Sequence, residues 1–244
     1  MSVIERPRTV DIPAQEQRRT THGTLVMIGG KAGDDLLHAI SETLPPSSER
    51  HFMVAAMASG NPLSQYTRYK EGFSLSNVKT DHLLIQDEEQ EEYKYLLDGI
   101  SGVFFTGGQQ DKLMAALNKS KLRKEIYDYY VSGGTILGTS AGASFMGEIM
   151  PIKDRHEKGI GFVPHIIDQH IRRPDREGRL HRLISEFPGR IGIGLDENTA
   201  AIYNTDGNLK ILGEGQVFVL QTNESNEIDE CVLTHGQQYS ISEK

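Results

Sequence analysis

The chain is poor in residues that cross-link or anchor a protein. It has one cysteine, Cys231, in 244 residues, so no disulfide can form within the chain. Its cysteine and histidines show no zinc-site spacing. No apolar run reaches the length of about 18 residues that a membrane helix needs, and no basic start leads into an apolar stretch. These absences predict a cytoplasmic protein with no metal ion, no membrane span and no secretory signal.

Positive charge is also scarce. The 26 Lys and Arg residues face 34 Asp and Glu residues, which gives a formal net charge of -8 at pH 7. Because phosphate binding depends on clustered basic side chains, this balance argues against nucleic acid as the main ligand. It suits a small or cationic substrate better.

The first 22 residues differ from the rest of the chain in composition and in apolar pattern. They mix Arg, Gln, Glu, Thr and Pro without an apolar period, which predicts a flexible N-terminal arm over residues 1–22. The remainder is long enough to bury one sizeable core. We therefore expect a single domain over residues 23–244.

Apolar runs alternate with amphipathic stretches in the first two thirds of this domain. The pattern predicts an α/β fold with a mainly parallel sheet, helices on both faces and an active site at the carboxyl ends of the strands. Short alternating strands after residue 195 predict an antiparallel C-terminal ribbon. The expected strands are 24–28, 52–58, 82–85, 103–106 and 135–138, then 199–203, 210–213 and 216–221, and the expected helices are 34–44, 110–118 and 122–131.

The strongest chemical signal is a Gly-x-Ser-x-Gly turn that follows the apolar stretch at 135–138. Ser140 is its central residue, with the small residues Gly138, Ala141 and Gly142 around it. Such a turn between a strand and a helix is a nucleophile elbow, which exposes a serine in a strained backbone conformation. The free amide of Ala141 is a predicted oxyanion donor. The alternative is a tight strand–helix junction with a bystander serine.

A glycine pair, Gly107-Gly108, follows the buried stretch at 103–106. In a parallel sheet it faces the same crevice as Ser140, so Gly108 is the second expected oxyanion donor, with a plain strand-to-helix loop as the alternative. A serine nucleophile also needs a base. His170, at the end of the apolar stretch 166–170, is the predicted base, and the alternatives nearby are His165, His156 and His181.

Five motifs occur together along the chain: Gly-Thr-Ser-Ala-Gly-Ala-Ser, Phe-Thr-Gly-Gly-x-Gln, Ile-Asp-Gln-His, Gly-Arg-Leu-x-Arg-Leu and Asp-Glu-Asn-Thr-Ala. As a set they resemble the cyanophycinase and dipeptidase E family of serine peptidases over residues 23–219. The resemblance implies a class I glutamine-amidotransferase-like, flavodoxin-like fold with three layers. It also supports His170 as the base and implies a glutamate as the third member of a triad. Glu157 is the expected glutamate, with Glu148 and Glu197 as alternatives.

The same resemblance implies a substrate pocket. The matching positions are Gln110, Asp168, Gln169, Arg179 and Arg182. Arg179 and Arg182 suit carboxylates because a guanidinium presents a planar fork, while Asp168 would neutralise an arginine side chain. The alternative for the arginines is a solvated basic helix face. The stretch 171–177 is longer than the family pattern.

The resemblance implies hydrolysis of cyanophycin, or multi-L-arginyl-poly-L-aspartate, to β-Asp-Arg dipeptides by a homodimer that uses no metal and no organic cofactor. Two alternatives stay open: a peptidase of the same fold that acts on small aspartyl or isoaspartyl peptides, and a catalytically silent binding homologue. A glutamine amidotransferase is disfavoured, because that chemistry uses a cysteine at the elbow and Cys231 lies outside any such turn.

Overall fold

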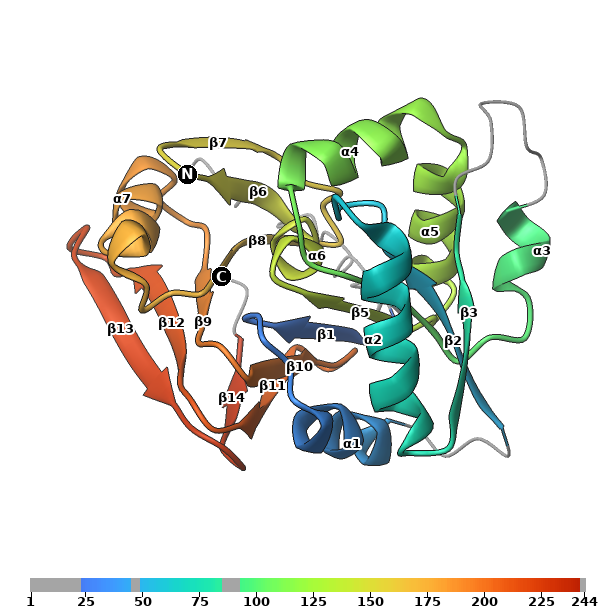
Figure 1. Ribbon diagram of the computed structural model, residues 1–244. Helices are drawn as coiled ribbons and strands as arrows, with labels where there is room; N and C mark the ends of the chain where they lie inside the picture. Colours follow the sequence, from blue (N-terminus) through green and yellow to red (C-terminus); the bar gives the residue numbers. More distant parts are fainter. Residues whose placement is uncertain (1–22, 45–48, 85–92, 242–244) are drawn as a thin grey trace, which may run out of the picture.

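The computed structural model describes residues 23–44, 49–84 and 93–241, which form two β-sheets and the helices that cover them (Figure 1). The strands of the first sheet are β1 (Leu25–Ile28), β2 (Arg50–Ala55), β3 (Val78–His82), β4 (Gly102–Phe105), β5 (Ile136–Thr139), β10 (Thr199–Tyr203), β11 (Asn208–Gly213) and β14 (Gln238–Ser240). Their order is β14-β11-β10-β1-β5-β4-β2-β3. Pairing is parallel from β1 to β3 along this order and antiparallel from β1 to β14.

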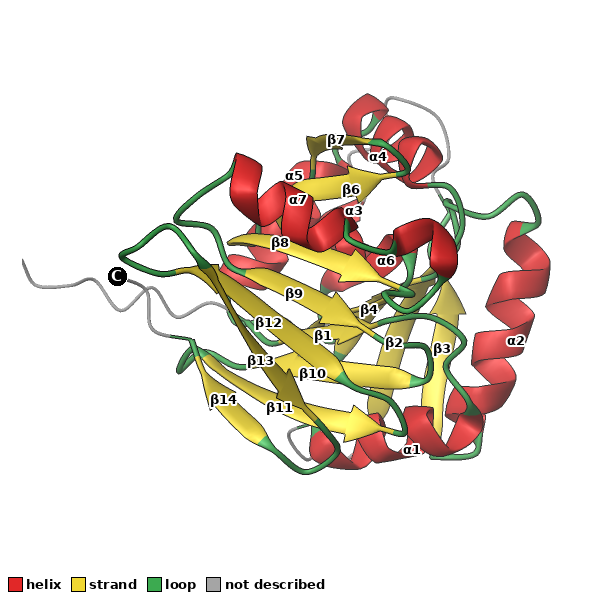
Figure 2. Ribbon diagram, turned by 90° about the vertical axis from the view of Figure 1, so that its left-hand side faces the viewer, coloured by secondary structure: helices red, strands yellow, loops and turns green. Residues whose placement is uncertain are grey.

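A second sheet packs against the first. Its strands are β6 (Gly147–Ile152), β7 (Arg155–Lys158), β8 (Val163–Gln169), β9 (Gly192–Leu195), β12 (Val217–Thr222) and β13 (Ile228–Leu233), in the order β13-β12-β9-β8-β6-β7. Strand β8 lies parallel to both β6 and β9, and the other pairs are antiparallel. Figure 2 shows β8, β9 and β12 side by side in this sheet.

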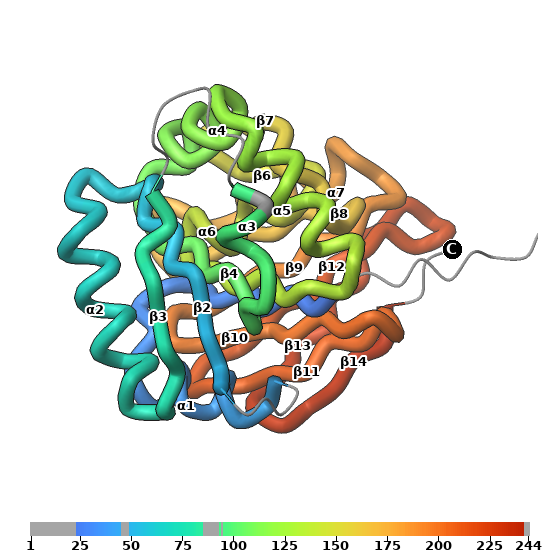
Figure 3. The backbone as a smooth tube through the Cα atoms, turned by 90° about the vertical axis from the view of Figure 1, so that its right-hand side faces the viewer, coloured from blue at the N-terminus to red at the C-terminus, as the bar shows by residue number. Residues whose placement is uncertain are grey.

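Helices occupy three positions around the sheets. Helices α1 (Asp34–Thr43) and α2 (Pro62–Ser74) cover one face of the first sheet, and α2 runs alongside β3 at its edge (Figure 3). The other face holds α3 (Tyr93–Leu97), α4 (Gln110–Lys119), α5 (Leu122–Val131) and the short α6 (Ala141–Ser144). After the 3-10 turn η1 (Pro174–Arg176), α7 (Arg179–Glu186) packs on the outer side of the second sheet.

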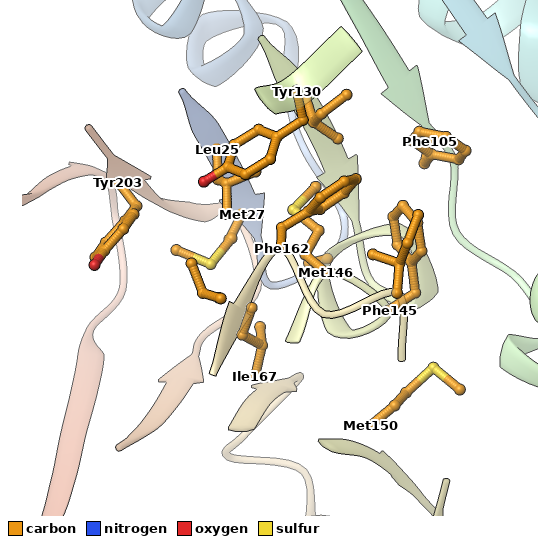
Figure 4. Packing of buried hydrophobic residues seen from close by; sticks show 14 of the residues in the cluster. Leu25, Met27, Phe105, Tyr130, Phe145, Met146, Met150, Phe162, Ile167 and Tyr203 are labelled. Carbon is orange, nitrogen blue, oxygen red and sulfur yellow. The ribbon is translucent and has the colours of Figure 1, made fainter. Parts of the chain in front are cut away.

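Strand β1 shows why the central strands are uninterrupted apolar runs. Leu25 and Met27 point into the core between the two sheets, where they join Phe145, Phe162 and Ile167 (Figure 4). The other two residues of this strand, Val26 and Ile28, point to the opposite face and pack with α1 and α2. A strand that is covered on both faces has no polar position, so its sequence does not alternate.

The predicted α/β architecture is confirmed in its parallel half. The helices expected at 34–44, 110–118 and 122–131 correspond to α1, α4 and α5, and four expected strands correspond to β1, β2, β4 and β5. The strand expected at 82–85 is misplaced: β3 ends at His82, and Ile85 lies outside the described residues. Strand β3 is an edge strand with alternating burial, which is a weaker signal than the apolar run after it. Helix α2 was not predicted.

The single sheet with a C-terminal ribbon is the main error of the sequence-based prediction. The strands expected at 199–203 and 210–213 extend the first sheet as β10 and β11, whereas the one expected at 216–221 belongs to the second sheet as β12. The fold is therefore α/β with two mixed sheets. Among the described residues, no helix is long and apolar enough to cross a membrane. The domain boundary at residue 23 stays a prediction, since residues 1–22 and 242–244 lie outside the described part.

Candidate active site

Ser140 stands at the junction between β5 and α6, in a backbone conformation that side chains rarely adopt. Its φ is 53° and its ψ is -114°, and its N–H donates to Ile28 O at 2.9 Å. The flanking glycines make this turn possible. A Cβ added at Gly138 would lie 1.8 Å from Gly142 O, and one added at Gly142 would lie 2.2 Å from Phe105 O. The elbow predicted from the sequence is present in the structure, and its strain projects Oγ away from the strand.

His170 lies beside this serine, as the sequence predicts. It follows β8 directly, and its Nε2 is 3.0 Å from Ser140 Oγ. Its backbone is also in the left-handed region, with a φ of 52°, and its N–H donates to Gly29 O at 3.0 Å. A Cβ added at Gly30 would lie 2.1 Å from His170 Cε1, so the imidazole packs directly on the backbone of the loop after β1.

The acid that contacts this histidine is Glu197. Its Oε1 lies 2.7 Å from His170 Nδ1, and its Oε2 is 2.6 Å from Lys31 Nζ. Two bonds of Asn198 hold this turn to the β1 loop: its N–H donates to Gly30 O at 2.8 Å, and its Oδ1 accepts from Gly33 N at 2.9 Å. The loop after β1 therefore positions both the histidine and the glutamate.

The expectation that Glu157 contacts the histidine is wrong. Glu157 lies on β7, at the edge of the second sheet, and ion-pairs with Arg155. The alternative Glu148 is also engaged elsewhere, with Arg190 at 2.8 Å. The physical reason is topology. Strands β8 and β9 are parallel neighbours with Gln169 opposite Leu195, so the residues that follow these two strands come together.

The three alternative histidines lie elsewhere in the structure, away from Ser140. His165 is buried within β8, and burial lowers its pKa to about 4. His156 packs edge-on against the ring of Phe187. His181 lies 3.2 Å from Glu230.

The electrostatics of the histidine and its glutamate favour a neutral base. Burial lowers the pKa of His170, and the charges of Arg176 and Arg173 lower it further, against the opposing effect of Glu197. The hydrogen bond from Lys31, followed by that from His170, lowers the pKa of Glu197. Near neutral pH the pair is therefore an ionised carboxylate and a neutral imidazole, which is the state that accepts a proton from a serine.

Both predicted oxyanion donors lie beside the serine loop. Ala141 is the first residue of α6, so its N–H has no acceptor within that helix. Gly108 follows β4 and has a φ of 147°, and a Cβ there would lie 2.2 Å from Ala58 O. Its neighbour Gly107 faces the nucleophile, since a Cβ there would lie 3.7 Å from Ser140 Oγ. The glycine pair thus gives the backbone close access to the reacting centre.

Two of the predicted pocket residues brace the serine loop. Gln110 Nε2 donates to Ser144 Oγ at 2.8 Å and to Pro151 O at 2.7 Å, which ties α4 to the segment after the elbow. Gln169 is buried, and its Oε1 lies 3.5 Å from Ser140 Oγ.

Asp168 and Arg179 neutralise each other. Arg179 Nε donates to Asp168 Oδ2 at 2.9 Å, and its Nη2 bonds the other carboxylate oxygen. Both side chains are buried, and Asp168 Oδ1 also accepts from Gln169 N at 2.7 Å. The expectation that Asp168 is free to bind a substrate arginine is therefore wrong, because its charge is already paired.

The other predicted arginine does not reach the pocket within this chain. Arg182 lies on the exposed face of α7, 3.9 Å from Glu186 one turn away, which agrees with a solvated helix face. Arg176 lies closer to the site. Burial and the neighbouring charge of Arg179 lower the pKa of its guanidinium. Arg176 Nη1 and Arg179 Nη1 are both buried without a hydrogen-bond partner among the described residues.

Cavities lie on both sides of the segment that contains these arginines. One, of about 430 Å³, is lined by His170, Glu197 and Asp196. The other, of about 440 Å³, lies between the 171–181 segment and strands β12 and β13. Within the described residues, no group of three or more His, Cys, Asp or Glu side chains is arranged to hold a metal ion.

The sequence-based prediction missed the contribution of the loop after β1. Gly30 packs against the histidine and Lys31 pairs with the glutamate. A signal for them exists: Gly29-Gly30 directly follows a buried strand, as Gly107-Gly108 does. Both pairs lie at the carboxyl edge of the same parallel sheet, where active sites of α/β proteins are found.

A serine in a strained elbow, bonded to a histidine that is bonded in turn to a carboxylate, is the arrangement of a serine hydrolase. The chain belongs to peptidase family S51, which matches residues 25–212, and it is a serine peptidase. It is 33% identical over 235 residues to a cyanophycinase of Nostoc sp., covering 87% of this chain and 78% of that protein. It is 34% identical over 184 residues to a cyanophycinase of Synechococcus elongatus, covering 68% of this chain and 57% of that one.

Two solved structures share the fold. A peptidase from an acI-B1 Actinobacterium superposes with a TM-score of 0.68 at 21% identity, covering 91% of this chain and 98% of that chain. A putative peptidase E protein from Listeria monocytogenes superposes with a TM-score of 0.59 at 14% identity, covering 83% and 100%. At these identities the likeness concerns the architecture alone.

Proposed function

We propose that the protein is a serine exopeptidase that hydrolyses cyanophycin to β-Asp-Arg dipeptides. The observation that carries this proposal is the hydrogen-bonded series Ser140, His170 and Glu197 together with the half-buried Arg176 and the buried Arg179. The chain's similarity to two proteins named cyanophycinase supports the choice of substrate.

The proposed mechanism uses the triad in two steps. Ser140 Oγ attacks the peptide carbonyl while His170 Nε2 takes its proton, and the amides of Gly108 and Ala141 stabilise the oxyanion. His170 then gives this proton to the leaving amine as the C–N bond breaks. In the second step His170 removes a proton from water, which attacks the acyl-enzyme, and the proton returns to Ser140 as the ester bond breaks. Glu197 holds the imidazole and stabilises its charged form.

The arginine pair supports recognition of an aspartyl carboxylate. A buried N–H without a partner is costly, and a carboxylate that accepts from Arg176 and Arg179 would remove that cost. The guanidinium of Arg179 is held by Asp168, which leaves its Nη1 without a hydrogen-bond partner among the described residues. Gln110 and Gln169 would act from the opposite side by holding the serine loop.

One observation favours a second candidate, a peptidase for small aspartyl or isoaspartyl peptides. Because the charge of Asp168 is paired with Arg179, this carboxylate is not available to an arginine side chain, whereas Nη1 of Arg176 and of Arg179 could donate to an aspartate. A pocket of this kind would accept Asp peptides that lack arginine.

Product analysis separates the two candidates. Purified protein is incubated with cyanophycin and, separately, with β-aspartyl peptides that lack arginine, and the products are identified by mass spectrometry. A β-Asp-Arg product from cyanophycin supports the proposal, and its absence together with cleavage of the small peptides supports the second candidate. Ser140→Ala should abolish either activity while it leaves the melting temperature nearly unchanged. Activity retained by that variant would exclude the serine mechanism.

Three further properties belong to the same proposal. We infer a class I glutamine-amidotransferase-like fold from family membership. We also expect a homodimer in the cytoplasm, as stated from the sequence. Light scattering on the purified protein tests the dimer.

A further inference from the structure

The guanidinium of Arg172 is bound in a small cradle next to the triad. Its Nε lies 3.1 Å from Asp196 Oδ2, its Nη2 donates to Gln216 Oε1, and its Cζ lies 5.6 Å from the centre of the Phe218 ring. A carboxylate, an amide oxygen and an aromatic face together satisfy the charge, the donors and the flat surface of a guanidinium.

The cradle is built independently of the arginine that fills it. Asp196 is buried, and backbone bonds with Gln216 hold it on both sides: Gln216 N donates to Asp196 Oδ2 at 3.0 Å, and Asp196 N donates to Gln216 O at 3.1 Å. Gly215 closes the turn, since a Cβ there would lie 2.6 Å from Asp196 Cβ. The Asp196 carboxylate and the backbone of Gln216 therefore keep their places without Arg172.

Arg172 itself is loosely held. Its side chain is 62% exposed, and it comes from the segment 171–178, where most residues are exposed. Solvent screens the exposed guanidinium, and the long arginine side chain loses freedom when it pairs with Asp196, so the net stabilisation is small. A competing guanidinium that arrives with additional contacts would displace it.

The cradle opens toward the catalytic residues. Asp196 directly precedes Glu197, and the cavity of about 430 Å³ is lined by both, by His170, by Arg172 and by the exposed Glu214. A ligand in this cavity touches Asp196 of the cradle together with His170 and Glu197, while Phe218 lines the neighbouring cavity. Asp196, Glu197 and Glu214 give this cavity acidic charge.

We propose that Asp196, Gln216 and Phe218 form the binding site for an arginine side chain of the substrate, and that Arg172 occupies it until the substrate displaces it. This inference rests on the proposed function, because it assigns the guanidinium of the same substrate. The site takes over the role that the sequence assigned to Asp168. Specificity for arginine then depends on exchange between one guanidinium of the chain and one of the substrate.

Binding to the Ser140→Ala protein tests the exchange without turnover. Titration calorimetry compares β-Asp-Arg with β-Asp-citrulline, which replaces the guanidinium by a neutral urea of the same shape. Arg172→Ala should bind β-Asp-Arg about two- to fivefold more tightly and leave β-Asp-citrulline unchanged. Gln216→Leu and Phe218→Leu should each reduce the preference for arginine over citrulline about two- to fivefold.

The matched control is Arg155→Ala, which removes another exposed arginine, 52% accessible, on strand β7. Arg155→Ala should change the affinity for neither β-Asp-Arg nor β-Asp-citrulline. Unchanged or weaker binding of β-Asp-Arg to Arg172→Ala, or no measurable binding to any variant, overturns the exchange. An unchanged arginine preference in both Gln216→Leu and Phe218→Leu overturns the cradle.

Failure of the proposed function can be distinguished from failure of the arginine-binding site. If wild-type protein releases no β-Asp-Arg from cyanophycin while the variants change arginine binding as expected, the cradle stands and the substrate assignment falls. If cyanophycin is hydrolysed while the cradle variants bind as the Ser140→Ala parent does, the substrate assignment stands and the cradle falls.

Discussion

The carboxyl edge of the first sheet and the arginine-rich segment after β8 are held in place by different forces. At the sheet edge, Ser140 and His170 have left-handed backbone angles fixed by hydrogen bonds to the strand and loop of β1. In the arginine-rich segment, Arg173 and Asp175 lie on the surface and are held by a local ion pair of 3.0 Å. Close backbone packing leaves one arrangement, whereas exposed ion pairs leave several of similar free energy.

This difference separates the chemistry of the protein from its choice of substrate. The triad depends on backbone packing that a side chain at Gly30 or Gly142 would disrupt. The segment that bears Arg172 and Arg176 can change in length and sequence with little effect on the elbow. Substitutions at residues of the site and the core, each compared with a control substitution, test this division.

The largest expected effect concerns the two glutamates. Glu197→Gln should lower kcat/KM for β-aspartyl peptides about a thousandfold or more, because an amide neither fixes the imidazole tautomer nor stabilises its charge. Glu157→Gln, on the exposed strand β7, should leave kcat/KM within about twofold of wild type. Equal losses in the two variants would contradict the assignment of Glu197.

The next effect compares two arginines of helix α7. Arg179→Met leaves the buried Asp168 without its partner, so the free energy of unfolding should fall by about 3 to 5 kcal/mol. Arg182→Met removes an exposed charge and should change it by less than about 0.5 kcal/mol. Urea unfolding at pH 7 measures both. A small change in Arg179→Met would mean that Asp168 finds another partner.

A third prediction concerns stability in acid and the buried His165. Since burial lowers its pKa from 6.5 to about 4, the unfolded chain binds a proton there that the folded chain does not bind between these pH values. Its contribution is complete above about pH 6.5 and is lost as the pH falls toward 4, by about 3 kcal/mol at most. His165→Phe should therefore lose less stability between pH 7 and pH 5 than wild type in urea unfolding. The exposed His181→Gln serves as control and should behave as wild type does.

The smallest effect concerns Lys31, the exposed partner of Glu197. Because burial lowers the pKa of His170, the acid limb of kcat/KM should lie below the ordinary value of 6.5. Without the lysine, Glu197 becomes more basic, stabilises the imidazolium more strongly and raises the pKa of His170. Lys31→Met should thus move the acid limb to higher pH, whereas Lys31→Arg should not. A shift to lower pH would contradict this linkage.

Much of the site could be predicted because its signals are local. An elbow needs small residues around one serine, and two glycines after a buried strand mark a close approach of backbone. Local signals of this kind do not identify Glu197 as the glutamate of the triad. Strand β9 is Gly-Ile-Gly-Leu, which lacks the branched apolar run of a typical strand, and without it Glu197 has no place beside His170. The glycines are required because α7 packs on them: a Cβ at Gly192 or Gly194 would lie 3.0 Å from Leu180.

Local sequence patterns establish the class of fold and the position of the nucleophile, because apolar periodicity and turn residues act within a few positions of one another. The base was selected from several histidines by the resemblance of the motifs to a known family. Tertiary contacts alone establish which glutamate completes the triad, that Asp168 is paired with Arg179, and that Arg172 fills a cradle of its own. Each of these depends on how β8, β9 and β12 pair within the second sheet and on how α7 packs on them, which local sequence patterns do not reveal.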